Sequence, residues 1–112
     1  MRLARIRHLA FTVRDLELSV RWYRDLFELD EIRREVSDER SAAILGAFAS
    51  PFQLGLVQHG SSGGNRFDPT TVGLDHAAWS VEQRDDLDAW ESVLTANGVE
   101  HSPSSTSDRS RS

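Results

Sequence analysis

Residues 6–13 show the period-two alternation that is typical of a β-strand. One face of this strand would carry Leu9, Phe11 and Val13. The other face would carry Ile6, His8, Ala10 and Thr12. The pattern therefore predicts a strand that places a histidine on the face opposite its large apolar side chains.

A helix is expected directly after this strand. Its apolar positions recur at three- and four-residue intervals, at Leu16, Val20, Tyr23 and Phe27. Asp15 is a suitable N-cap, and Glu17 would lie near the positive end of the helix dipole. We expect the helix to end near Phe27.

Three further strands are predicted in the next part of the chain. Residues 30–36 and 41–48 are separated by the polar turn 37–40, and Pro51 introduces a strand over 52–58. A flexible connector rich in Gly and Ser follows at 59–66.

A second strand–helix pair is predicted beyond this connector. The strand covers 73–81, and the helix covers 85–96 and ends at Asn97-Gly98, which is a common helix C-terminal signal. We expect the helix to bury three apolar side chains, those of Leu87, Trp90 and Leu94. Residues 99–101 resemble the start of another strand.

The two strand–helix pairs are similar to one another. His8-Leu-Ala-Phe-Thr-Val matches His76-Ala-Ala-Trp-Ser-Val, and each histidine is followed fourteen residues later by a tryptophan, Trp22 or Trp90. Because both the strand and the helix take part in the match, we interpret it as an internal repeat. A paired arrangement of such repeats would bring two imidazoles together, as a metal centre requires.

Composition limits the class of protein. A chain of 112 residues with 38% apolar content suits one globular domain, and no apolar run reaches transmembrane length. There is no cysteine, so disulfides and thiolate chemistry are excluded. We find no secretory signal at the start of the sequence and expect a cytoplasmic protein with no membrane partner.

The charged residues exclude several functions. The net charge is −5 and no basic stripe is present, so we expect no nucleic-acid partner. All 13 basic residues are arginine, which excludes Schiff-base chemistry and a P-loop lysine. No carboxylate–histidine–hydroxyl pattern of a nucleophilic enzyme can be assigned.

These segments resemble the vicinal oxygen chelate superfamily, which includes glyoxalase I, bleomycin-resistance proteins, fosfomycin-resistance enzymes and extradiol dioxygenases. Residues 5–27 are similar to the opening of its first module. Residues 73–81, followed by Leu87-Asp-Ala-Trp and by 97–103, are similar to the opening of its second module. The resemblance covers residues 5–103 and specifies the superfamily rather than one activity.

The resemblance implies an α+β fold of paired βαβββ modules. We expect a domain over 1–103, built from module one at 5–59, a connector at 60–70 and a partial module two at 71–103. The remaining residues, 104–112, are rich in Ser and Arg and are expected to be disordered. The second module is thus incomplete, and the chain resembles a truncated or frameshifted product.

In this superfamily a divalent metal ion commonly lies between the modules. Carried over by position, His8 and His76 match two of the ligands. A glutamate ligand of glyoxalase-like members falls at Gly55, which has no donor side chain, and the strand carrying the last carboxylate is missing. The implied ion is Fe, Mn, Zn or Ni, because imidazole and carboxylate suit these metals.

Other residues have two interpretations. His59 could point to the mouth of the pocket or be a solvated residue at the end of a strand, and His101 has the same standing. Trp79 is a candidate substrate contact, although it and the other large aromatics at Phe11, Trp22 and Trp90 are more typical of a core. Arg33 and Arg34 are read most simply as solvated surface.

Three functions therefore stay open. The first is a metal-dependent lyase, isomerase or dioxygenase acting on a small oxygenated molecule. The second is a metal-free protein that binds a small molecule, as bleomycin-resistance proteins do. The third is an inactive truncated product. The family also allows a homodimer in which modules are exchanged. The sequence does not specify the substrate, the metal or the oligomeric state.

Overall fold

The computed structural model describes residues 1–48, 51–60, 64 and 66–103, and the chain forms two compact units, Met1–Phe67 and Asp68–Ser112. The elements of the first unit are β1 (His8–Thr12), α1 (Leu16–Phe27), β2 (Asp30–Val36), β3 (Arg40–Gly46) and β4 (Gln53–His59). The second unit contains α2 (Arg84–Ala96).

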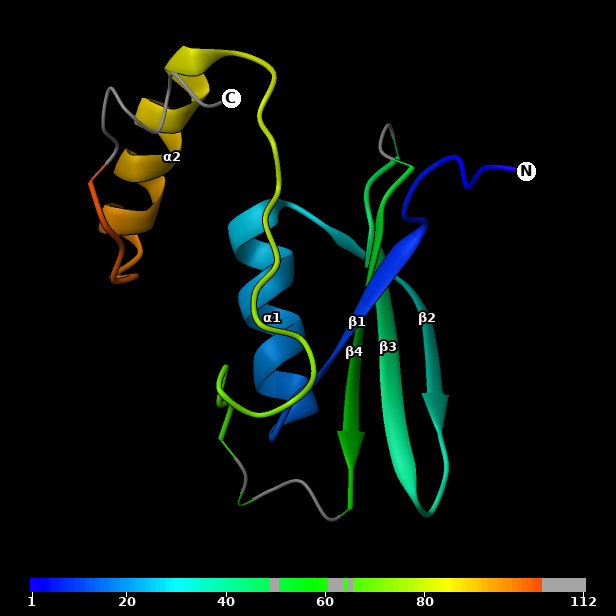
Figure 1. The fold of residues 1–112 in the computed structure, drawn as a ribbon. Helices are drawn as coiled ribbons and strands as arrows, with labels where there is room; N and C mark the ends of the chain where they lie inside the picture. Colours follow the sequence, from blue (N-terminus) through cyan, green and yellow to red (C-terminus); the bar gives the residue numbers. More distant parts are fainter. Residues whose placement is uncertain (49–50, 61–63, 65, 104–112) are drawn as a thin grey trace. The chain divides into compact units, whose positions relative to one another are not determined.

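The first unit is a four-stranded sheet with α1 against one face (Figure 1). The strand order is β1-β4-β3-β2. β1 runs parallel to β4, and the other neighbours are antiparallel. These elements form a βαβββ module in which the last strand, β4, pairs with the first strand, β1.

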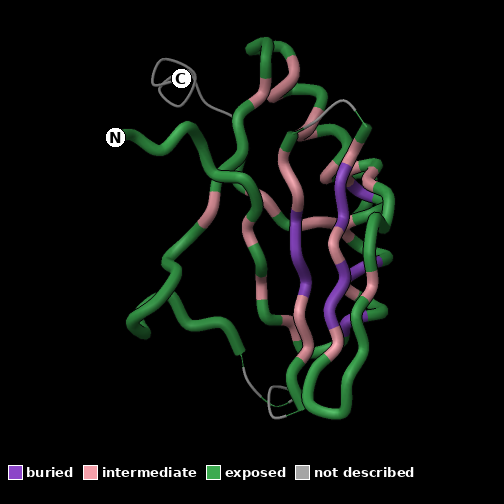
Figure 2. The backbone as a smooth tube through the Cα atoms, turned by 90° about the vertical axis from the view of Figure 1, so that its right-hand side faces the viewer, coloured by how far each residue is buried: buried purple, intermediate pink, exposed green. Residues whose placement is uncertain are grey.

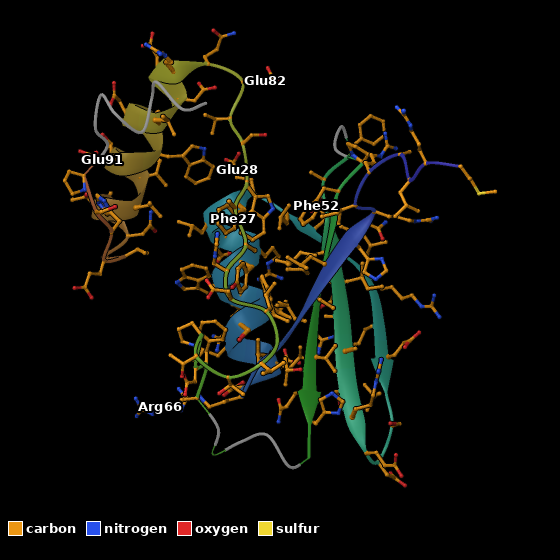
Figure 3. The ribbon with its side chains drawn as sticks, in the orientation of Figure 1. Phe27, Glu28, Phe52, Arg66, Glu82 and Glu91 are labelled. Atoms are coloured by element: carbon orange, nitrogen blue, oxygen red, sulfur yellow. The ribbon has the colours of Figure 1, made fainter. Side chains whose placement is uncertain are left out.

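The sequence determines α1 locally. The Asp15 side chain accepts a hydrogen bond from the Leu18 N–H at 3.1 Å, as an N-cap does. The helix ends where Glu28 takes the left-handed conformation (φ 54°), and the Leu29 N–H then bonds to the Arg24 carbonyl at 3.0 Å (Figure 3). The predicted N-cap and the predicted end near Phe27 are both confirmed.

The core lies between α1 and the central strands. Figure 2 shows that burial is concentrated on these elements. The fully and nearly buried residues of this core are Leu16, Val20, Ala43, Leu45, Leu54 and Leu56. The four strand residues among them, Ala43, Leu45, Leu54 and Leu56, point to the same side of the sheet, because residues two apart along a strand, and residues directly opposite each other, share a face. The opposite face of the sheet, which we call the open face, is not covered by α1.

In the second unit, α2 is capped at both ends. The Gln83 N–H donates to Asp86 Oδ2 at 3.0 Å at the start of the helix. At the end, Gly98 has a left-handed φ of 69°, and the Val99 N–H donates to the Leu94 carbonyl at 2.9 Å. A further bond from the Gly98 N–H to the Thr95 carbonyl completes a Schellman motif. The predicted helix and its stop signal are therefore confirmed.

Three expectations for the second unit are wrong. Residues 73–81 pair with no strand in the described part of the chain, and neither do residues 99–101. The apolar side chains Leu87, Trp90 and Leu94 are only half-buried, and α2 has no fully buried residue. A strand needs a hydrogen-bonded neighbour, and a helix face needs a surface to pack against. The expected tail, 104–112, lies outside the described residues.

The expected α+β class is confirmed, with one βαβββ module and an incomplete second one. No helix in the described part of the chain is both long and apolar enough to span a membrane.

Candidate functional site on the open face of the sheet

A cavity of about 270 Å³ lies on the first unit. Its lining comes from all four strands and consists of His8, Ala10, Arg33, Glu35, Arg40, Ala42, Ala43, Ile44, Gly55 and Val57. A volume of this size exceeds the roughly 150 Å³ that accommodates a benzene molecule. The cavity can therefore take a ring or a short chain together with a polar head group.

Strand register explains why these residues meet. Ala10 is opposite Gly55, which is opposite Ile44, which is opposite Arg33. Directly opposed residues share a face of a sheet, so this row crosses the open face from β1 to β2. The next row, from Val57 through Ala42 to Glu35, runs beside it. The cavity thus has a floor of small and apolar side chains.

Gly55 lies at the centre of this floor. A Cβ atom added to Gly55 would lie 3.0 Å from the Cβ of Ala10, which is closer than ordinary van der Waals contact. Residue 55 is also the position where the family resemblance would place a glutamate. The structure therefore has a flat backbone surface here and supplies no donor side chain.

Charged side chains form one side of the cavity. Glu35 Oε1 lies 2.6 Å from Arg33 Nη2, and Glu35 Oε2 lies 3.8 Å from Arg40 Nη2. All three side chains are about half exposed or more. Two guanidinium groups thus flank one carboxylate, and the cluster keeps a net positive charge.

Arg34 differs from Arg33 because it points to the other face of the sheet. It forms ion pairs with Glu31 and with Glu17 of α1. The hydrogen bonds to these two glutamates raise the pKa of Arg34 above its usual value, and the bond to Glu31 has the larger effect. The interpretation as solvated surface therefore holds for Arg33, whose side chain is 66% exposed at the rim of the cavity, and is wrong for Arg34, which connects β2 to α1.

The two candidate histidines of the first unit lie on the same face. His8 begins β1, is exposed and lines the cavity. His59 ends β4 opposite Arg40, with the parity of Gly55, but it is not among the lining residues. The structure therefore places His8 on the lining of the cavity, at β1, and His59 beside Arg40 but outside that lining.

His76 belongs to the second unit. Its Nδ1 lies 2.7 Å from Asp75 Oδ1, and the imidazole is 80% exposed. A carboxylate on one ring nitrogen orients the ring and leaves Nε2 for another partner. Trp79 follows in the same segment and is 50% exposed, so it is not a core residue of its unit.

His101 is engaged within the second unit. Its Nε2 lies 2.8 Å from Thr95 Oγ1, and its Nδ1 lies 2.9 Å from the Ser102 carbonyl oxygen. Both ring nitrogens thus have a neighbour near the end of α2.

The donor set was compared with the needs of a divalent metal. Among the residues that the structure describes, no three His, Cys, Asp or Glu side chains form a group that could hold an ion. The cavity contributes His8, but its carboxylate, Glu35, is already paired with arginine. The described residues therefore do not bring together the ligand set that the resemblance implies.

The sequence interpretation missed the charged cluster. Arg33 and Glu35 are two residues apart and so share a face, a signal that is visible in the sequence. Their assignment to the open face depends on the β2–β3 register, which shifts between Glu31 and Arg33. An irregularity of this kind changes which face of the sheet the later side chains of the strand point to, so the face cannot be counted from the start of the strand.

The chain was then compared with known proteins. The profile of the Glyoxalase/Bleomycin resistance protein/Dioxygenase superfamily matches residues 5–108. A solved glyoxylase/bleomycin resistance protein/dioxygenase domain from Frankia sp. EAN1pec is 35% identical, with a TM-score of 0.83. That similarity covers 93% of this chain and 81% of the Frankia protein. No curated protein matches this sequence significantly.

Two more distant structures share the fold. The fosfomycin resistance protein FosX from Listeria monocytogenes, solved with Mn(II) and 1S,2S-dihydroxypropylphosphonic acid, is 17% identical with a TM-score of 0.67, and the match covers 91% of this chain and 75% of FosX. Leishmania major glyoxalase I, described as trypanothione-dependent, is also 17% identical with a TM-score of 0.66, covering 94% of this chain and 74% of that enzyme. The profile match and the Frankia domain show that this chain belongs to the Glyoxalase/Bleomycin resistance protein/Dioxygenase superfamily.

Proposed function

We propose that this chain binds a small oxygenated molecule on the open face of its first module, without a metal ion. The observation that carries the proposal is the cavity floor at Gly55. There the backbone lies flat beside Ala10, in the place where the family resemblance puts a metal-binding glutamate. A ligand can rest on this floor and meet polar groups at its sides.

The composition of the cavity supports this function. Binding sites for small molecules combine an apolar surface with a few placed polar groups. Ala10, Ile44 and Val57 supply the apolar surface, and His8 supplies an imidazole that can donate or accept a hydrogen bond. This arrangement suits a ligand with an apolar body and at least one oxygen.

Benzamide is a suitable neutral probe because its ring fits the volume and its amide carries both a donor and an acceptor. We expect a two-dimensional NMR titration of the full chain to shift the amides of Ala10, Ala42 and Gly55. The amides of Leu18 and Trp22, on the exposed side of α1, are the control. Shifts that avoid the open face would overturn the proposal.

A second candidate is a metal-dependent enzyme. The matched positions of His8 and His76 favour it, and so does the carboxylate that orients His76. In this case His8 and His76 would hold a divalent ion (Fe, Mn, Zn or Ni), which could polarise an oxygen of a lyase, isomerase or dioxygenase substrate. Trp79, close to His76 in sequence, would then be a substrate contact.

Calorimetric titration with Mn(II) and Zn(II) separates the two candidates. The metal-dependent enzyme requires one ion per chain, lost in both His8→Ala and His76→Ala. His59→Ala is the control, because His59 is a histidine on the same face of the sheet that does not line the cavity. Binding that survives both substitutions contradicts the second candidate, and stoichiometric binding that both remove contradicts the metal-free proposal.

A further inference from the structure

The charged side of the cavity specifies a ligand class. Arg33 and Arg40 come from neighbouring strands and converge on Glu35, so the same carboxylate contacts both guanidinium groups. From this arrangement we propose that the cavity takes an anionic ligand whose carboxylate or phosphonate group replaces Glu35 between Arg33 and Arg40. The inference rests on the proposed function, because it names the ligand class of the same cavity.

The charge balance at the cavity favours an anion. The lining residues include two arginines and one glutamate, although the whole chain has a net charge of −5. The neighbouring acidic residues Asp38 and Glu39 lie in the turn before β3 and do not line the cavity. Guanidinium groups bind carboxylate and phosphonate oxygens through paired hydrogen bonds, so the cluster matches such groups in shape as well as in charge.

The internal carboxylate is a weak competitor. Glu35 and its two arginine partners are between 48% and 66% exposed, and exposed ion pairs contribute only about 0–1 kcal/mol. A ligand anion can displace Glu35 at little cost and then gains apolar contacts on the floor. By contrast, Arg34 is held by two glutamates on the covered face and is not available.

The fold explains the direction of the ligand. Arg33 and Glu35 lie on β2, and Arg40 is the first residue of β3. Ala10 lies on β1 and Gly55 on β4. An anionic head at β2 would therefore direct the rest of the ligand across the floor toward His8. Benzoate and phenylphosphonate have this form, with a ring and one anionic group.

The test compares these two anions with neutral benzamide by NMR titration of the full chain. Benzoate and phenylphosphonate should bind at least roughly tenfold more tightly than benzamide, as a charge-assisted hydrogen-bonded contact provides. Arg33→Gln and Arg40→Gln should each remove most of this preference, because they weaken binding of the two anions far more than binding of benzamide. Arg21→Gln, on the exposed surface of α1, is the matched control and should change neither.

The substitution Glu35→Gln should have the opposite effect on anion binding. Removing the internal carboxylate should tighten benzoate binding severalfold, a result that a purely structural role of Glu35 would not produce. If benzamide and benzoate bind the open face equally, or if the arginine variants weaken both alike, the anion proposal is wrong and the proposed function stands. If neither anions nor benzamide reach the open face, the proposed function is wrong as well.

Discussion

The two strand–helix repeats have similar sequences but different structures. The repeat that begins at His8 forms a paired strand and a helix with buried side chains. The repeat that begins at His76 forms a helix with no fully buried residue, and its first segment pairs with no strand among the described residues. The same local pattern therefore leads to a packed module in one place and to a single capped helix in the other.

The difference comes from the chain that follows each repeat. After α1 the sequence supplies β2, β3 and β4, and β4 pairs with β1. After α2 the described residues supply only 97–103, which form no strand. A β-strand is stabilised by its neighbours, whereas a well-capped helix forms its hydrogen bonds within itself. The second repeat therefore keeps its helix and lacks its strand.

The largest expected effect tests whether the first unit is stabilised by its packed core, through removal of a core side chain. Leu56 on β4 is fully buried. Leu56→Ala should lower the free energy of unfolding by about 3 kcal/mol, because it leaves a cavity in a packed core. Urea unfolding followed by far-ultraviolet circular dichroism measures this loss. Leu18→Ala, at a 60% exposed position of α1, should change it by less than about 0.5 kcal/mol.

A matched pair of leucines compares the two repeats directly. Leu26 and Leu94 occupy the same position in the two repeats, but Leu26 is 8% exposed and Leu94 is only half-buried. Leu26→Ala should reduce stability by about 2 kcal/mol, and Leu94→Ala by about 1 kcal/mol or less. Amide hydrogen exchange within each helix provides the measurement. Equal losses would mean that α2 is as well packed as α1.

The end of α2 offers a backbone test. Gly98 has φ 69°, a conformation that costs a residue with a Cβ atom about 1–2 kcal/mol. Gly98→Ala should therefore speed amide exchange in the last turn of α2. Gly64→Ala is a useful control, because an added Cβ at Gly64 meets nothing within 4 Å. No change at Gly98 would show that the Schellman motif does not limit the stability of α2.

The end of α1 should respond in the opposite direction. Glu28 takes the left-handed conformation there without being glycine. Glu28→Gly should raise the free energy of unfolding by about 0.5–1 kcal/mol, because glycine has no Cβ penalty at this position. Thermal unfolding measures the gain. A lower melting temperature would instead mean that the Glu28 side chain itself stabilises the helix end.

The smallest expected effect concerns pH and is confined to the first unit. Burial raises the pKa of Tyr23 above its usual value of 10.0, because the phenolate would lose contact with water. The neutral phenol is thus favoured in the folded state. Its contribution is complete below pH 10.0 and is lost as the pH rises through the folded pKa.

Absorbance at alkaline pH and urea unfolding at several pH values test this expectation for Tyr23. Because the protein has one tyrosine, the absorbance change reports that residue alone. Tyr23→Phe should remove the alkaline loss of stability. Titration of Tyr23 at or below its usual pKa would contradict the effect of burial.

Much of the first module is predictable from the sequence. Asp15, the apolar spacing of α1 and the polar turn before β3 all specify local structure, and each prediction agrees with the structure. The sequence interpretation treated Arg33 and Arg34 alike as solvated surface, which holds for Arg33 and fails for Arg34, because neighbouring residues of a strand point to opposite faces. Only the register of β2 with β3 decides which arginine lines the cavity.

The candidate site, like the fold, was determined partly by the sequence and partly by the tertiary structure. The sequence alone determined the superfamily, the βαβββ order, the two helices, the Asp15 N-cap, the stop signal at Gly98 and the absence of a donor side chain at Gly55, because these depend on residue identity and local spacing. Tertiary structure decided the rest. It placed Arg33, Glu35 and Arg40 beside a floor of small residues and left 73–81 unpaired in the described chain. Strand pairing and burial depend on partners distant in sequence, which no local pattern can supply.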